Sequence, residues 1–345
     1  MHSNAHKCPN PKRPSPVAKA SSPSKAILFG EHAVVYGKLG VAAAVDRRIN
    51  VSVEPGAGGA EFDTFKADRS ELQKALKDFR AARAAGDIAA LKAMDYRGAI
   101  MVALAEAMDR WGWADVKIHR NRDESVKGLG GSAAIFAALA HATAALLGKQ
   151  PSADEISSIA YAGDCVMHGG TPSGIDNSTV AHGGYISYRK GEGPKRLDIA
   201  FTAPLVVVLS GEAASTAEMV TKVRQLHEQQ TSFVDGIMAE IESIAIAGLD
   251  ALKAGDIEKI GPLMYANHEL LRKLGVSTAK LDVIVELARK EGAPGAKLTG
   301  AGGGGCAIVL ARNEEQANKL VGSYARAGFK AFTAQMGAAG VRLEG

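Results

Sequence analysis

The stretch KGLGGSAA, residues 127–134, decides the fold prediction and is named the first glycine loop. Its glycines allow backbone conformations with φ > 0 and let amide groups approach an anion closely. The apolar segment 132–147 behind it predicts a buried helix. A helix N-terminus offers unpaired N–H groups and the positive end of the helix dipole. The loop is therefore expected to cradle phosphate groups, with the Ser132 hydroxyl within reach of a metal ion bound to them.

Other interpretations compete for this stretch when it is taken alone. It fits the loose pattern GxGxxA of dinucleotide sites, but the polar connector 121–127 separates it from the preceding strand and spoils the tight strand–turn–helix unit. A Walker A loop is absent, because Gly37 and Lys38 are followed by Leu39 instead of Ser or Thr. A glycine turn that only packs against its neighbours also stays open.

The elements around this loop mix strands and helices without regular alternation, which predicts an α+β fold. Strands are expected at residues 25–29, 41–53, 116–119, 205–209 and 307–310 and within 329–343, and helical spacing covers 69–110, 132–147, 153–168, 213–254, 256–274, 277–291 and 314–327. Residues 1–22 are rich in Pro, Ser, Lys and Asn and are expected to form a disordered tail. A Gly/Pro break at 191–194 predicts an N-terminal domain over 23–195 and a C-terminal domain over 196–345.

Composition and charge exclude several classes of protein. The chain has 345 residues, which is enough for two domains. Its net charge of +4 equals the charge of the four basic residues within residues 1–20, so the rest is neutral and gives no reason to expect nucleic-acid or membrane binding. Cys8, Cys165 and Cys306 lie far apart, without zinc-site spacing, and no apolar stretch is long enough to span a bilayer. These features predict a cytoplasmic protein.

Two acidic residues flank a turn-rich stretch that begins at Gly170. Asp176 follows the flexible Gly174, and Asp164 lies twelve residues earlier, near the end of an expected helix. Two acids that return to one region can divide the work, one holding Mg²⁺ and the other handling a proton. Taken singly, Asp176 is typical of an Asx turn, and Asp164 is typical of a solvated helix face.

Two further segments suggest a ligand. Lys25 begins a strand that is expected to enter the core, where a cation needs a partner such as Asp176 or a phosphate group. Residues 300–305, the second glycine loop, hold five glycines in six positions before an apolar strand. So much backbone freedom favours a ligand or a close backbone contact, with a hairpin loop as the alternative.

In this order, the segments resemble the GHMP kinase superfamily, which includes galactokinase, homoserine kinase, mevalonate kinase and phosphomevalonate kinase. The words GEHAVVYG at 30–37 and PSGIDN at 172–177 are similar to the mevalonate kinase family in particular, as are segments at 215–220, 263–282 and 337–341. The resemblance extends from about residue 22 to residue 343.

The resemblance implies a two-domain GHMP kinase fold, with an N-terminal domain like the second domain of ribosomal protein S5, a ferredoxin-like C-terminal domain and the active site between them. It implies transfer of the γ-phosphoryl group of ATP to the 5-hydroxyl of mevalonate, with Mg²⁺. Asp176 matches the catalytic base and Lys25 its partner, Glu31 and His32 match the segment beside the substrate, and Ser132 and Asp164 match metal ligands. The residues that match the ATP-phosphate loop are Lys127, Gly128, Leu129, Gly130, Gly131, Ser132, Ala133 and Ala134.

The chain departs from the family pattern at three places. Gly131 stands where the family usually has Ser, no Pro occurs near residues 124–125, and Asp164 replaces a glutamate ahead of a segment that is one residue longer. Two alternatives follow. A phosphomevalonate kinase would need more basic residues near Glu31 and His32 than Lys38, Arg47 and Arg48. A non-catalytic sensor of the same fold would be expected to have lost Lys25, Ser132 or Asp176. A homodimer stays open.

Overall fold

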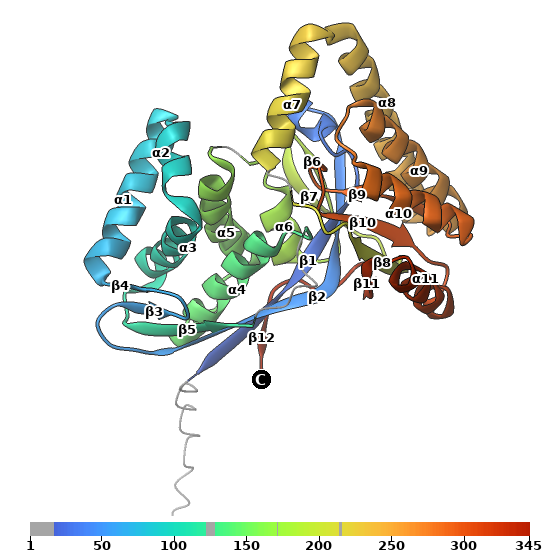
Figure 1. Cartoon of the computed structure of the whole chain (residues 1–345). Helices are drawn as coiled ribbons and strands as arrows, with labels where there is room; N and C mark the ends of the chain where they lie inside the picture. Colours follow the sequence, from blue (N-terminus) through green and yellow to red (C-terminus); the bar gives the residue numbers. More distant parts are fainter. Residues whose placement is uncertain (1–16, 122–127, 171, 214–215) are drawn as a thin grey trace, which may run out of the picture.

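The computed structural model describes residues 17–121, 128–170, 172–213 and 216–345 (Figure 1). Within these residues the strands form an eight-stranded and a four-stranded sheet, and helices cover both, which confirms the α+β class. The larger sheet has the order β12-β1-β2-β5-β3-β4, with β6 paired to β2 and β7 paired to β6. Its strands are β1 (Ala18–Phe29), β2 (Gly40–Pro55), β3 (Ala60–Phe62), β4 (Lys66–Ala67), β5 (Val116–Arg120), β6 (Tyr185–Arg189), β7 (Gly193–Leu197) and β12 (Arg342–Glu344).

The smaller sheet is antiparallel, with the order β11-β8-β10-β9. Its strands are β8 (Pro204–Leu209), β9 (Gly295–Thr299), β10 (Cys306–Leu310) and β11 (Lys330–Gln335). β8, β9 and β10 are almost entirely buried, so this sheet forms the centre of the C-terminal half of the chain.

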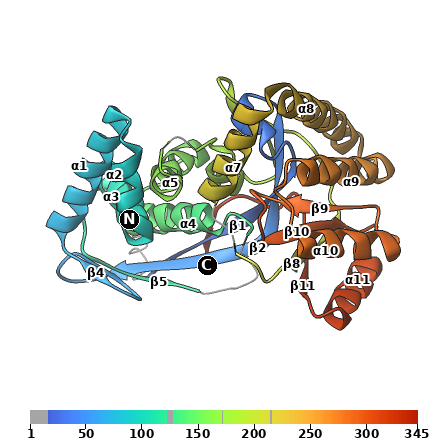
Figure 2. The same ribbon diagram turned by 45° about the horizontal axis from the view of Figure 1, so that its top comes forward.

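Helices of the N-terminal half pack on one side of the larger sheet. They are α1 (Arg69–Ala85), α2 (Ile88–Ala93), α3 (Asp95–Trp111), α4 (Gly131–Leu146), α5 (Ala153–His168) and α6 (Ile175–His182). α4 is apolar nearly all round because it lies over β1 and β2 while α3 and α5 pack around it (Figure 2). The expected helical region 69–110 consists of three helices, α1, α2 and α3, which are separated at Gly86 and Met94.

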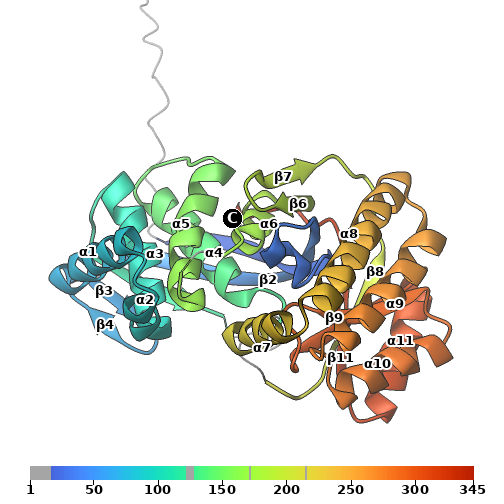
Figure 3. The ribbon, with the colours of Figure 1, turned by 90° about the horizontal axis from the view of Figure 1, so that it is seen from above.

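The C-terminal half contributes a second group of helices: α7 (Thr216–Gln229), α8 (Thr231–Ala254), α9 (Ile257–Lys273), α10 (Ala279–Lys290) and α11 (Glu314–Arg326). Seen from above, α1–α5 and α8–α11 lie on opposite sides, with α6, α7 and the short 3-10 helix η1 (Ala33–Tyr36) between them (Figure 3). None of the helices in the described ranges is long and apolar enough to cross a membrane.

The predicted C-terminal boundary of the disordered tail, residue 22, is wrong. Residues 1–16 lie outside the described residues, but β1 already begins at Ala18, within the predicted tail 1–22. Ala18 pairs with Val53 of β2, and Lys19 pairs with both Ser52 of β2 and Glu344 of β12. Local composition predicts disorder here, but strand partners from distant parts of the chain supply the backbone hydrogen bonds and override it.

We predict opposite effects of two Gly→Ala changes in α8. A Cβ at Gly248 would lie 2.4 Å from the ring of Phe29, which is fully buried, so Gly248→Ala should destabilise the fold by about 1–3 kcal/mol. A Cβ at the exposed Gly236 would meet nothing within 4 Å, so Gly236→Ala should stabilise the helix by about 0.5–1 kcal/mol. Urea unfolding of both variants checks the pair, and equal effects would contradict the packing of α8 against β1.

Candidate active site

A buried lysine on β1 and an aspartate at the start of α6 form an ion pair. Lys25 Nζ of β1 lies 2.9 Å from Asp176 Oδ1, with 6% of the Lys25 side chain and 27% of the Asp176 side chain exposed. Asp176 lies in the first turn of α6, which Gly174 begins with φ of 85°. A carboxylate at this position is stabilised by the helix dipole. The structure thus brings together the two residues that were predicted to be catalytic partners.

The first glycine loop rests on the stem of the same lysine. The backbone N–H of Lys25 donates to the Leu129 carbonyl at 2.8 Å, and a Cβ at Gly130 would lie 2.7 Å from Lys25 Cε. Gly130 has φ of 70° and begins α4. Any other residue here would face both backbone strain and displacement of the lysine. The loop and the ion pair therefore form one unit.

The N-terminus of α4 provides the expected amide donors. In a helix the first N–H groups have no intrahelical acceptor, which leaves those of Gly131, Ser132 and Ala133 for a ligand. The Ala134 N–H already donates to the Gly130 carbonyl at 3.2 Å. Gly128, with φ of 81°, is exposed at the start of the described part of the loop. Lys127, which was also predicted to bind the phosphates, lies outside the described residues.

Asp164 lies beside the ion pair inside the protein. It is 1% exposed on α5, so the alternative of a solvated helix face is wrong. Burial raises its pKa well above the usual value, the charge of Asp176 raises it further, and Lys25 lowers it. Its Oδ1 has no hydrogen-bond partner among the described residues.

This donor set fits a cation that is shared with phosphate groups. The part of the chain that the structure describes holds no cluster of three or more His, Cys, Asp or Glu residues that could bind a metal alone. Mg²⁺ is usually bound through one or two carboxylates together with substrate phosphates and water. An unpaired buried carboxylate oxygen near a phosphate cradle meets that requirement.

Glu31 and His32 follow the end of β1, in the turn before η1, and their side chains already have partners. Glu31 forms a buried ion pair with Lys297 of β9, and the exposed fractions of the two residues are 1% and 0%. Burial raises the pKa of Glu31 and lowers that of Lys297, while the attraction between them opposes both shifts. The His32 Nε2–H donates to the Ala301 carbonyl at 2.8 Å, and burial lowers the pKa of His32, which favours its neutral form.

Lys297 is the main site residue that was not predicted from the sequence. It stands in the apolar strand AKLT directly before the second glycine loop. The signal was the one that singled out Lys25, a cation within a strand bound for the core, and applying it twice would have found both lysines.

The second glycine loop is a hairpin connection between β9 and β10 and also makes close backbone contacts. A Cβ at Gly302 would lie 2.1 Å from the Val276 carbonyl oxygen, and one at Gly304 would lie 2.8 Å from the Glu212 backbone. Cys306, the first residue of β10 after the loop, lies against the first glycine loop, since its Sγ would lie 2.8 Å from a Cβ at Gly128. The start of β10, directly after the second glycine loop, thus contacts the first glycine loop.

An open pocket of about 430 Å³ lies between α2 and α7. Lys92 of α2 lines it, together with Glu218 and Lys222 of α7. The aliphatic stem of Lys92 lies against Gly169, the residue at which α5 ends. Asp164 lies five residues earlier on the same helix. None of the described residues that line this pocket is one of the predicted site residues.

Two family models match the chain. Residues 98–184 match the GHMP kinases N terminal domain, and residues 249–330 match the GHMP kinases C terminal model. The chain is 36% identical to a mevalonate kinase of Pyrococcus horikoshii over 86% of this chain and 89% of that protein, and 34% identical to one of Aeropyrum pernix over 95% and 98%. It is also similar to the crystal structure of L. major mevalonate kinase in complex with R-mevalonate, with a TM-score of 0.74, 29% identity and coverage of 93% and 96%.

We predict that removing only one partner of the Glu31–Lys297 pair strongly lowers the free energy of unfolding. Lys297→Met leaves a buried carboxylate without its cation and should destabilise the protein by about 3–5 kcal/mol. The double variant Lys297→Met/Glu31→Gln removes that charge and should recover part of the loss. Urea unfolding measures both, and a double variant as unstable as the sum of the single ones would contradict the coupling.

Proposed function

The chain belongs to the mevalonate kinase family of GHMP kinases, and on that premise we propose that it transfers the γ-phosphoryl group of ATP to the 5-hydroxyl of mevalonate. The α+β two-domain fold of this family was expected from the motifs and is confirmed. The limits 23–195 and 196–345 stay predictions. One observation carries the proposal for the site: the Lys25–Asp176 pair, at 2.9 Å, lies directly against Gly130 of the first glycine loop.

Asp176 is the proposed base. Its carboxylate accepts the proton of the 5-hydroxyl while that oxygen bonds to the γ-phosphorus and the bond to ADP breaks, giving 5-phosphomevalonate and ADP. Lys25 holds the carboxylate in place, and its ammonium faces the charge that grows on the transferred group. Phosphoryl transfer depends mainly on such positioning and charge stabilisation, so a fixed ion pair beside the phosphate cradle suits it.

The amides of Gly131, Ser132 and Ala133, with the turn at Gly128, are proposed to bind the phosphates of ATP. Ser132 and Asp164 are the residues that would hold Mg²⁺, because the Ser132 hydroxyl lies in the first turn of α4 and Asp164 Oδ1 is unpaired. When bound, the ion neutralises phosphate charge. Glu31 and His32 are proposed to line the mevalonate side, where Lys297 and Ala301 fix their side chains.

A phosphorylated substrate is less compatible with these residues. Lys38 lies 3.0 Å from Glu242, Arg47 Nε donates to the Thr333 carbonyl at 2.8 Å, and Arg48 Nη1 donates to the Ala339 carbonyl at 2.7 Å. The basic side chains that a phosphomevalonate kinase would need near Glu31 are thus committed elsewhere. A non-catalytic sensor is disfavoured because Lys25, Ser132 and Asp176 are all retained. A cytoplasmic location and a homodimer stay predictions.

Substrate choice tests the assignment directly. ADP release by the purified chain should depend on mevalonate and should be much slower with phosphomevalonate, galactose or homoserine at equal concentration. Mass spectrometry should identify the product as 5-phosphomevalonate. Equal or faster turnover of phosphomevalonate or galactose would refute the proposed substrate.

The Lys25–Asp176 pair should act as one unit. Asp176→Asn keeps the shape but cannot accept a proton, so kcat should fall by about 10²–10⁴ with a smaller change in KM. Lys25→Met should also lower kcat, and the double variant should be far from additive. The exposed pair Lys66–Glu61, at 3.0 Å, supplies a control, because Lys66→Met and Glu61→Gln should leave kcat unchanged. A normal rate for Asp176→Asn would eliminate it as the base.

A further inference from the structure

The second glycine loop (residues 300–305) lies between the two halves of the candidate site. On one side its Ala301 carbonyl accepts from His32, and on the other Cys306 lies against Gly128 of the first glycine loop. The position of this loop therefore affects the distance between the first glycine loop, which is proposed to bind ATP, and His32, which is proposed to line the mevalonate site. Glycines give the loop no rigidity of their own, so the rigidity must come from contacts outside it.

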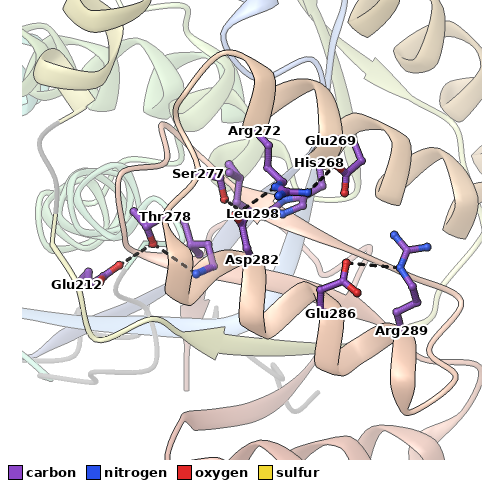
Figure 4. A network of polar contacts seen from close by, with 11 residues as sticks. Glu212, His268, Glu269, Arg272, Ser277, Thr278, Asp282, Glu286, Arg289 and Leu298 are labelled. Carbon is purple, nitrogen blue, oxygen red and sulfur yellow. Dashed lines mark hydrogen bonds and ion pairs between the residues drawn. The ribbon is translucent and has the colours of Figure 1, made fainter.

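Two connections grip this loop from outside. The Gly303 N–H donates to the Val276 carbonyl at 2.7 Å, in the connection between α9 and α10. The Gly305 N–H donates to the Glu212 carbonyl at 2.9 Å, in the connection between β8 and α7. The Thr278 hydroxyl joins the two connections, because it donates to Glu212 Oε2 at 2.6 Å (Figure 4).

Asp282 organises the first connection from α10. Its Oδ1 accepts from the Ser277 hydroxyl at 2.6 Å and faces His268 Nε2 of α9 at 3.2 Å, and its Oδ2 accepts from Arg272 Nε at 3.2 Å (Figure 4). Both carboxylate oxygens thus face donors. Ser277 directly follows Val276, so this carboxylate fixes the residue next to the one whose carbonyl holds the loop.

His268 extends the network into β9. The backbone N–H of Leu298 donates to His268 Nδ1 at 3.3 Å, which places the ring hydrogen on Nε2, toward Asp282. The ring is 1% exposed, and its pKa is lowered to about 4, mainly by burial. The charges of Asp282 and Glu269 oppose this shift, and Lys297 of β9 adds to it. The neutral ring that this relay needs is therefore maintained at neutral pH.

The residues on either side of Leu298 reach across to β1. Lys297 pairs with Glu31, and the Thr299 hydroxyl accepts from the Ile27 N–H at 2.9 Å and donates to the Ile27 carbonyl at 3.0 Å. The Asp282–His268–Leu298 relay thus fixes β9 at the point where the C-terminal half meets the strand that carries Lys25.

We propose that Asp282 and His268 are positioning residues for the transfer reaction: through Val276 and Leu298 they hold the second glycine loop at the spacing that aligns the two substrates, without touching either substrate. The kinetic part of this inference rests on the proposed function, whereas the part that concerns the loop does not.

Asp282→Asn is the first test. Both oxygens of Asp282 face donors, so the NH₂ group of an asparagine would meet a donor in either orientation and break part of the network. Misalignment of bound reactants lowers the rate of the chemical step more than binding. We expect kcat to fall about tenfold and KM for ATP and for mevalonate to change less than about threefold. Glu286→Gln is the matched control: it removes the same charge one turn later on α10, where Glu286 lies 3.8 Å from the exposed Arg289, and should leave kcat unchanged.

The position of the loop is measured without activity by the reactivity of the Cys306 thiol. Cys306 is fully buried, and replacing Cys8 and Cys165 by Ser leaves it as the only thiol of the chain. Asp282→Asn should speed its reaction with a thiol reagent at least about fivefold in the native protein, and Glu286→Gln should not. If Asp282→Asn does not fold, Ser277→Ala keeps the carboxylate and should show smaller changes in the same direction.

An unchanged labelling rate for Cys306 would overturn the proposal. So would a normal kcat in a variant that has only lost thermal stability, because the network would then be a structural tie alone. If the unsubstituted chain does not turn over mevalonate, the proposed function fails, and labelling alone then decides whether the network holds the loop.

Discussion

Burial of the Lys25 ammonium is the constraint on which the rest of the site depends. A lysine that is 5% exposed within a strand loses its hydration and is tolerated only beside an anion. The anion comes from α6, whose Asp176 lies 2.9 Å from the ammonium. The first glycine loop must then pass over the aliphatic stem at Gly130. One buried charge thus requires three segments that are far apart in the sequence to meet, and their meeting place is a phosphate cradle with an acid beside it.

A second buried cation acts in the same way between the two halves of the chain. Lys297 leaves β9 to reach Glu31, which follows β1 at the turn before η1. β1 therefore carries Lys25, which pairs with α6 of the N-terminal half. It is followed by Glu31, which pairs with β9 of the C-terminal half. The surroundings of the Glu31–Lys297 pair exclude water, which strengthens its attraction and makes an unpaired partner costly. Fixed charges of this kind need no reorganisation during a reaction, which suits phosphoryl transfer.

Glycines allow the close approaches that these pairs require. Gly130 leaves room for Lys25, and Gly302 leaves room for the Val276 carbonyl. Each glycine costs conformational entropy on folding, so a loop made of them holds a position only when contacts outside it define that position. In the second glycine loop this task passes to neighbouring connections and, through them, to a carboxylate on α10. Flexibility needed for close contact and rigidity needed for alignment thus reside in different parts of the chain.

Several features could be predicted from residue patterns alone: the α+β class, the helix over 153–168 to its last residue, the glycine-led start of α4 and the need of Lys25 for an anionic partner. Each of these follows from local periodicity, glycine turns or the cost of burying a charge. Three features follow only from three-dimensional contacts: β1 begins at Ala18, Asp164 is buried, and Lys297 pairs with Glu31. Strand pairing, burial of one helix face and pairing of charges depend on neighbours that are distant in the sequence, and local patterns carry no record of which distant residues those are.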